Sequence, residues 1–289
     1  MQPDPIEHKR SVPPQVAVQH TVVAAVAPDE HDDVLRIAWV RASTFGMRLV
    51  VCAIVNDAAD VAAAYEAIQR RVKSIIPQGP EPVIEVRVGD RAEQLLECAN
   101  QHDTELLVMG PASHREGILA RFFSPSLPTA VVRRAEFPVL VTRYSPPTGR
   151  IVAAVELGDA MNPILQAAQE EMRRAGGKLH VLHCVAPMPV ASAMEFPVAP
   201  PDGEMLDAAR TELERAIAAS PIPACDVKVE MGPAGQTILQ HARDLAADLI
   251  VVGTHGRSGP ARLLLGSIAE EVLRGAACNV MVVRSGSNA

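Results

Sequence analysis

The sequence predicts an α/β protein built from two tandem doubly wound domains, each with a five-stranded parallel sheet. Short apolar runs alternate with amphipathic segments of helical length along the chain, an order typical of right-handed β–α–β crossovers. The same order of elements occurs twice, which indicates an internal repeat. A length of 289 residues is enough for about two domains with separate cores.

The elements of the first half follow from apolar periodicity and from the turn residues between the runs. Asp29 is a candidate N-cap for the first helix. Strands are predicted at Thr21 to Ala27, Arg48 to Val55, Val83 to Val88, Glu105 to Met109 and Val139 to Thr142. Helices are predicted at Asp29 to Phe45, Asp57 to Ile76, Arg91 to Gln101 and Leu127 to Arg134.

The second half repeats this pattern, and Gly176 and Gly177 end its first helix. Its strands are predicted at Ile151 to Glu156, Lys178 to Val185, Asp226 to Glu230, Leu249 to Val252 and Val280 to Val283. Its helices are predicted at Met161 to Ala175, Glu204 to Ala219, Gly235 to Ala246 and Ser267 to Gly275. We therefore expect a flexible lead-in at 1–19 and domains at 20–146 and 147–289, joined near Tyr144 to Arg150.

The composition of the chain argues against nucleic acids and membranes as binding partners of the protein. A net charge of −7 and 3% aromatic residues argue against a nucleic-acid binder, because phosphate backbones need cations and bases need stacking platforms. No apolar run approaches the ~20 residues that a membrane span needs, and the first twenty residues lack the apolar core of a signal peptide. The five cysteines are scattered without a C-x-x-C pair, as expected for buried thiols of a cytoplasmic protein.

The stretch from Leu249 to Ser267 carries the strongest functional signal. An apolar strand ends in a loop with the pattern G-x2-G-x9-G-[ST], formed by Gly253, Gly256, Gly266 and Ser267. Glycines can adopt positive φ and lack Cβ, so backbone N–H groups can approach a phosphate, and Arg257 and Arg262 add positive charge. The helix that follows presents its N-terminus to an anion.

A second interpretation of the same residues is structural. Ser267 as N-cap and Glu270 at the third helical position would form a capping box, in which each side chain satisfies a backbone N–H of the other residue. The capping box and the phosphate site are compatible with each other.

Four segments, GRIVAAVE, KLHVLHCV, DLAADLIVVGTHG and CNVMVVR, occur in the order found in the universal stress protein family, and the loop pattern is complete. The chain resembles a tandem member of that family over most of its length. The resemblance implies a Rossmann-like, adenine nucleotide alpha hydrolase-like fold that binds ATP, AMP or ADP, with Mg²⁺ on the phosphates. It also implies a role in stress survival, usually without a settled catalytic activity. Family members dimerise through the last strand, so the VLVTR and VMVVR strands are expected to pair as an intrachain pseudo-dimer.

Carried over residue by residue, the resemblance assigns a nucleotide site to the second half. Ala154 and Cys184 would line the adenine pocket, with Val252 beneath the base and the backbone of Ile268 as a donor. Glu156 stands where the family usually has an aspartate near the nucleotide, and His255 lies inside the phosphate loop. Cys184 is either a reactive thiol or a small buried hydrophobic residue.

The first half departs from the loop pattern. Gly110 remains, but Ser113 and Pro125 replace the second and third glycines, and Ala27 replaces the acidic residue. Because proline has no N–H to donate, we expect this phosphate site to be lost, although His114 and Arg115 could still meet an anion.

Three functions remain open. The leading hypothesis is a nucleotide-responsive regulatory module that acts on an unknown protein partner, either as a single chain or as a homodimer of chains. Alternatives are a slow ATPase or nucleotidyl-transfer enzyme, for which the sequence offers only Glu156 and Asp159 as metal-binding carboxylates, and a nucleotide-free dimeric scaffold. No residue is predicted to be catalytic or to be a protein ligand of a metal; His180 and His183 face opposite sides of a strand. The segment from Ala186 to Gly203 is either a lid or docking segment or an extended connector.

Overall fold

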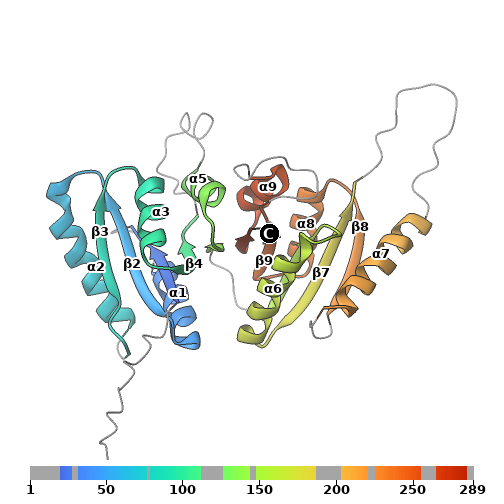
Figure 1. Cartoon of the computed structure of the whole chain (residues 1–289), viewed down its shortest axis with the longest axis horizontal. Helices are drawn as coiled ribbons and strands as arrows, with labels where there is room; N and C mark the ends of the chain where they lie inside the picture. The colour runs from blue at the N-terminus through green and yellow to red at the C-terminus, as the bar shows by residue number, and fades with distance from the viewer. Residues whose placement is uncertain are drawn as a thin grey trace, which may run out of the picture.

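A computed structural model describes residues 20–27, 32–76, 79–111, 126–143, 148–186, 203–220, 225–254 and 265–284. It shows two α/β halves of the same topology (Figure 1). The first half contains β1 (Thr21–Ala25), α1 (Asp33–Phe45), β2 (Arg48–Val55), a short 3-10 helix (Ala58–Asp60), α2 (Val61–Ile75), β3 (Val83–Val88), α3 (Arg91–Gln101), β4 (Thr104–Met109), α5 (Leu127–Arg134) and β5 (Val139–Val141).

The second half repeats these elements after a connection that contains residues 144–147. It contains β6 (Arg150–Val155), α6 (Met161–Ala175), β7 (Lys178–Val185), α7 (Gly203–Ala218), β8 (Asp226–Met231), α8 (Ala234–Asp244), β9 (Leu249–Gly253), α9 (Ser267–Gly275) and β10 (Asn279–Val283).

The predicted elements are all present, with small differences at their ends. The first helix begins at Asp33 and its N-cap is Asp32, whereas the predicted cap, Asp29, lies outside the described residues. The helix predicted from Asp57 opens as a 3-10 turn, in which the Asp57 carboxylate accepts from the Ala59 N–H at 2.9 Å. Helices α1 and α6 both end in a left-handed glycine, Gly46 and Gly176, with nearly identical φ and ψ.

The ten strands of the described residues form a single sheet in the order β3-β2-β1-β4-β5-β10-β9-β6-β7-β8. Pairing is parallel within each half, and the halves join through β5 and β10, which pair antiparallel. The sheet therefore contains the edge-to-edge pairing predicted for the last strands. Neither last strand remains as a free edge.

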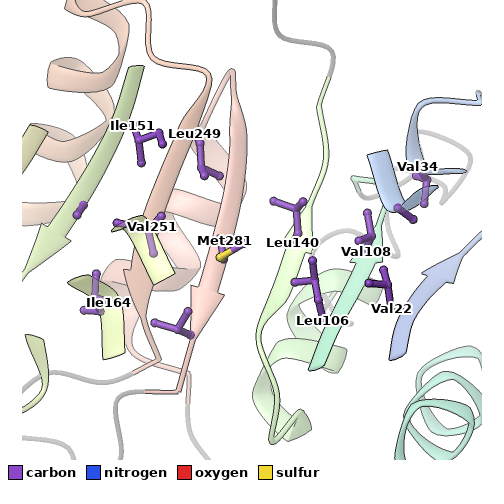
Figure 2. Packing of buried hydrophobic residues seen from close by; sticks show 14 of the residues in the cluster. Val22, Val34, Leu106, Val108, Leu140, Ile151, Ile164, Leu249, Val251 and Met281 are labelled. Atoms are coloured by element: carbon purple, nitrogen blue, oxygen red, sulfur yellow. The ribbon is translucent and has the colours of Figure 1, made fainter. Parts of the chain in front are cut away.

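The core consists of two apolar layers, one on each face of this sheet. One layer packs α1, α2, α6 and α7 against alternate strand residues, including Val22 and Val251. The other packs α3, α5, α8 and α9 against the intervening strand residues, including Val23 and Val252. Figure 2 shows part of the first layer, which continues across the junction of the halves through Leu140 and Met281.

Two further observations concern membrane-spanning helices and disulfide bonds. In the described part of the chain, no helix has the length and hydropathy that would let it cross a membrane. All five cysteines carry free thiols.

Candidate functional site

A cavity of about 620 Å³ opens at the carboxyl ends of β6, β7 and β9. The first residues of α8 and α9 form its other walls, with Ala234 from α8 and Ser267, Ile268 and Ala269 from α9. In doubly wound sheets, ligands bind in the crevice at this end of the strands. Its volume lies within the range of about 300–1,000 Å³ that is usual for ligand sites.

The structure brings most of the site residues predicted from the sequence to this one cavity. Those that line it are Ala154, Glu156, Cys184, Val252, Gly253, Gly266, Ser267 and Ile268. Three others, His255, Gly256 and Arg257, lie outside the described residues, as does Arg262. Residues separated by more than a hundred positions in the chain thus share one set of walls.

Sequence reasoning missed much of the apolar lining. Leu157, Ile164, Leu182 and Ile238 also border the cavity. Their only signal in the sequence is apolar periodicity, which predicts core packing equally well. Together with Ala154 and Val252, they give the cavity a largely hydrophobic wall.

The N-terminus of α9 provides backbone donors at the cavity. The Glu270 N–H donates to the Gly266 carbonyl at 3.0 Å, the first hydrogen bond of the helix. The N–H groups of Ser267, Ile268 and Ala269 therefore have no acceptor within the helix, and these three residues line the cavity. A helix N-terminus in this arrangement favours an anion.

The predicted capping box at this helix is wrong. Gly266, not Ser267, is the N-cap, and within the part of the chain that the structure describes no side chain caps the helix. Glu270 instead pairs with Arg274 at 2.9 Å and with Arg133 of the first half at 3.0 Å. Gly266 also does not use positive φ, since its φ is −61°, and its N–H donates to the Thr254 carbonyl at 2.8 Å, which closes the base of the loop.

Two side chains of β7 add polar atoms. His183 Nδ1 lies 2.9 Å from the Val155 carbonyl oxygen, and because a carbonyl only accepts, Nδ1 carries the hydrogen. Burial raises the pKa of the Cys184 thiol to about 12, with the nearby Glu230 charge adding to the effect, so Cys184 is a thiol at neutral pH. This favours the interpretation of Cys184 as a small hydrophobic residue over that of a reactive nucleophile.

The equivalent place in the first half is nearly filled. A cavity of only about 30 Å³ lies there, bordered by Ala25, Ala27, Ile54, Arg91 and Met109, among others. The residues of the predicted degenerate loop, from Ser113 to Pro125, lie outside the described residues.

A second group of chemically active side chains lies on the first half, away from either cavity. Glu85 on β3, Cys98 on α3 and His102 after α3 place ligand-type atoms within 4.8 Å of one another. The sequence did not reveal this cluster, because its members come from different elements. Arg48 lies 3.0 Å from His102 Nδ1, so His102 donates from Nε2 to Glu85, and Arg87 also donates to Glu85 at 2.8 Å. Two guanidinium groups and a fixed tautomer make this a satisfied hydrogen-bond network rather than a cation site.

Comparison with known proteins agrees with this architecture. The family model described as "Universal stress protein family" matches the chain twice, at residues 11–143 and 147–284. A universal stress protein A homolog of Coxiella burnetii is 33% identical over 138 residues, which cover 47% of this chain and 94% of that protein. A universal stress protein of Mycobacterium bovis is 28% identical over 202 residues, which cover 66% of this chain and 64% of that protein.

Solved structures share the fold over nearly the whole chain. A putative universal stress protein from Pseudomonas aeruginosa has a TM-score of 0.73 and 20% identity, covering 92% of this chain and 93% of its own. A universal stress protein from Archaeoglobus fulgidus has a TM-score of 0.64 and 17% identity, covering 94% of this chain and 99% of its own. The chain therefore belongs to the universal stress protein family, as a tandem member with two copies of the family's domain.

Proposed function

We propose that the second half binds ATP or another adenine nucleotide, such as AMP or ADP, and that the protein is a nucleotide-responsive stress or regulatory module. One observation carries this proposal: eight residues predicted from the sequence line one cavity at the carboxyl edge of the sheet. The apolar wall would hold the base, with Val252 beneath it and Ala154 and Cys184 beside it. The backbone of Gly266, Ser267 and Ile268 would meet the phosphates.

Mg²⁺ would accompany the phosphates and neutralise part of their charge. Glu156 borders the cavity and is the acidic residue that would accept from the ribose or base. His255, Gly256 and Arg257 complete the proposed set through the glycine pattern in the sequence. We assign no residue a catalytic role, because phosphoryl transfer needs a positioned nucleophile and metal-binding carboxylates in addition to a phosphate site.

The cellular setting belongs to the same proposal. Free cysteines are typical of a reducing compartment, so we place the protein in the cytoplasm. Nucleotide occupancy would change the surface around the cavity and thereby the choice of a regulatory protein partner. Whole chains would also associate as homodimers.

The test is to purify the protein without added nucleotide, denature it, and quantify released adenine nucleotides against protein concentration. About one nucleotide per chain is the expected result, and two per chain would contradict the loss of the first site. If none is released, a titration with Mg-ATP decides. Ligand at a hundredfold excess over Kd stabilises a protein by about 2.7 kcal/mol, so an unchanged Tm in saturating Mg-ATP would overturn the proposal.

Turnover is measured on the same preparation. A slow ATPase would release phosphate at a rate that survives further purification and disappears in Glu156→Gln. Binding without phosphate release supports the regulatory module over the enzyme.

A further inference from the structure

The two halves pair about a pseudo-twofold axis that passes between Leu140 and Met281. These residues are opposite each other in the antiparallel pairing of β5 and β10, and they occupy the same position in their own halves. Leu140 pairs in register with Val108, which lies two residues before Gly110. Met281 pairs in register with Val251, which lies two residues before Gly253. Figure 2 shows Leu140 and Met281 facing each other.

A buried ion pair lies beside this axis. Arg41 on α1 donates to the Glu171 carboxylate on α6, and the two side chains are only 9% and 6% exposed. Arg174, also on α6, contacts the second oxygen of Glu171. We call these three residues the interface triad. Arg41, Glu171, Arg174 and Leu140 border one cavity of about 300 Å³, which places the triad next to the strand pair.

Arg41 and Glu171 occupy equivalent positions in the two halves. Arg41 lies five residues before Gly46, and Glu171 lies five residues before Gly176, the glycines that end the equivalent helices. A symmetric pairing of identical halves would therefore place each of these residues against its own copy. Two first halves would bring Arg41 against Arg41 in a buried environment, where like charges repel strongly.

The position of Arg174 means that only the pairing of two first halves, and not that of two second halves, is opposed by charge repulsion. Arg174 lies two residues before Gly176, and the equivalent residue of the first half is Thr44. Two second halves would bring together two Glu171 and two Arg174, a group without net charge. Two first halves would bring together arginines with no carboxylate at these positions.

The interface triad is better suited to selecting a pairing partner than to stabilising the fold. Among the described residues, the Nε atoms of Arg41 and Arg174 are buried and have no hydrogen-bond partner. Burial lowers the pKa of Arg41 to about 9, which still leaves it charged at neutral pH. A buried ion pair often contributes less to stability than apolar residues of the same size, whereas breaking it is strongly destabilising.

We propose that the interface triad selects the pairing partner of the first half: it admits the second half of this protein and rejects another first half. The partner surface is defined by a carboxylate at the position of Glu171. The choice is independent of any nucleotide in the cavity, so this inference does not rest on the proposed function.

A charge-swap cycle on the full chain tests the proposal. Arg41→Glu and Glu171→Arg are each expected to lower Tm, the second by about 10 °C because it places three guanidinium groups together. The double variant Arg41→Glu/Glu171→Arg restores a carboxylate between two cations and should recover more than half of that loss. A double variant whose loss equals the sum of the two single losses would overturn the proposal.

Two further sets of variants complete the test. If Glu171→Arg does not fold, Glu171→Met and the triple variant Arg41→Met/Glu171→Met/Arg174→Met replace it. Glu171→Met leaves both guanidinium groups without their carboxylate and should destabilise the chain, and the triple variant should recover more than half of that loss. The matched control is Arg173→Glu/Glu170→Arg, which reverses an exposed pair on the same helix, with side chains 61% and 39% exposed, and should show no coupling.

Selection between chains is read by native mass spectrometry. Arg41→Glu and Glu171→Arg chains are refolded separately and together. If species of twice 30.8 kDa contain one chain of each kind in clear excess over the one half expected from random pairing, the result supports selection by charge. A mixture whose mass distribution equals the sum of the separate samples would contradict it.

Discussion

The two halves have the same topology, but the cavities at the carboxyl ends of their strands differ widely in volume. The second half has a cavity of about 620 Å³ at this edge, and the first half has one of about 30 Å³. Three equivalent positions that border both cavities carry larger side chains in the first half. Ile54, Met109 and Arg91 in the first half stand where the second half has Cys184, Val252 and Ala234.

The two halves thus differ in side-chain size at equivalent positions, while their strand ends are alike. The main chain at both sites ends its strands at the same places, with Gly89 donating to the Val55 carbonyl and Gly232 to the Val185 carbonyl. Larger side chains border the smaller cavity at the three positions. The two halves share their packing framework but differ in the volume open to a ligand.

The largest effect is expected from filling the second cavity with the residues of the first. Cys184→Ile/Val252→Met should weaken adenine nucleotide binding by about 100-fold, because the added methylene groups occupy the proposed base position. Isothermal titration with Mg-ATP measures the change. An unchanged Kd would show that the nucleotide does not use this cavity.

Removing the acidic residue comes next in size. Glu156→Ala copies Ala27 of the first half and should lower affinity about tenfold, as expected when a hydrogen bond to a charged group is lost. Titration is combined with urea unfolding of the free protein. Equal affinities for ATP in the variant and wild type would remove Glu156 from the proposed site.

The reciprocal change tests whether volume alone separates the halves. Ile54→Cys/Met109→Val should destabilise the protein by about 1 kcal/mol, since Met109 is only 1% exposed and its truncation leaves a gap. We expect no second nucleotide to bind, because the glycines of the loop and the acidic residue are still absent. Binding of two nucleotides per chain would contradict this and assign the whole difference to volume.

The smallest effect concerns a carboxylate–histidine pair in each half, Glu230 with His241 and Glu85 with His102. In the second half, burial opposes ionisation of Glu230, but hydrogen bonds and charges from Lys228 and His241 prevail and lower its pKa. A lowered pKa means that this stabilisation is present above the unfolded value of 4.5 and is lost as pH falls through the folded pKa.

Glu230→Gln should therefore lower the free energy of unfolding by about 0.5 kcal/mol at pH 7, a small effect because the site is partly exposed. The difference should shrink as the pH falls below 4.5, because the wild-type carboxylate becomes protonated. Urea unfolding at several pH values measures the difference between variant and wild type. Glu85→Gln is the matched variant in the first half, where burial again opposes ionisation but Arg87 and His102 lower the pKa of Glu85. A pH-independent difference in either half would contradict the assignment of the stability to these ionised carboxylates.

Much of the architecture could be read from local sequence. Helix α6 and strands β2, β3 and β7 have the predicted bounds, because apolar periodicity and terminal glycines act within a few residues. The repeat predicted two domains, and the apolar last strands predicted their pairing. Of the eight predicted residues that line the cavity, Gly253, Gly266 and Ser267 come from the glycine pattern, and the other five come from the resemblance to the family.

Only the tertiary structure decided the features that depend on contacts between distant segments. The N-cap of α9 is Gly266 because its N–H bonds the carbonyl of Thr254, on the far side of the loop. The first cavity is bordered by Ile54, Arg91 and Met109, which come from three different elements.

In the interface triad, Arg41 and Glu171 are 130 positions apart in the chain. Their role in pairing can be inferred only once the pseudo-twofold axis between the halves is known. Sequence periodicity records which face of an element is buried. It carries no record of what that face meets, because long-range packing and electrostatics depend on the positions of all elements together.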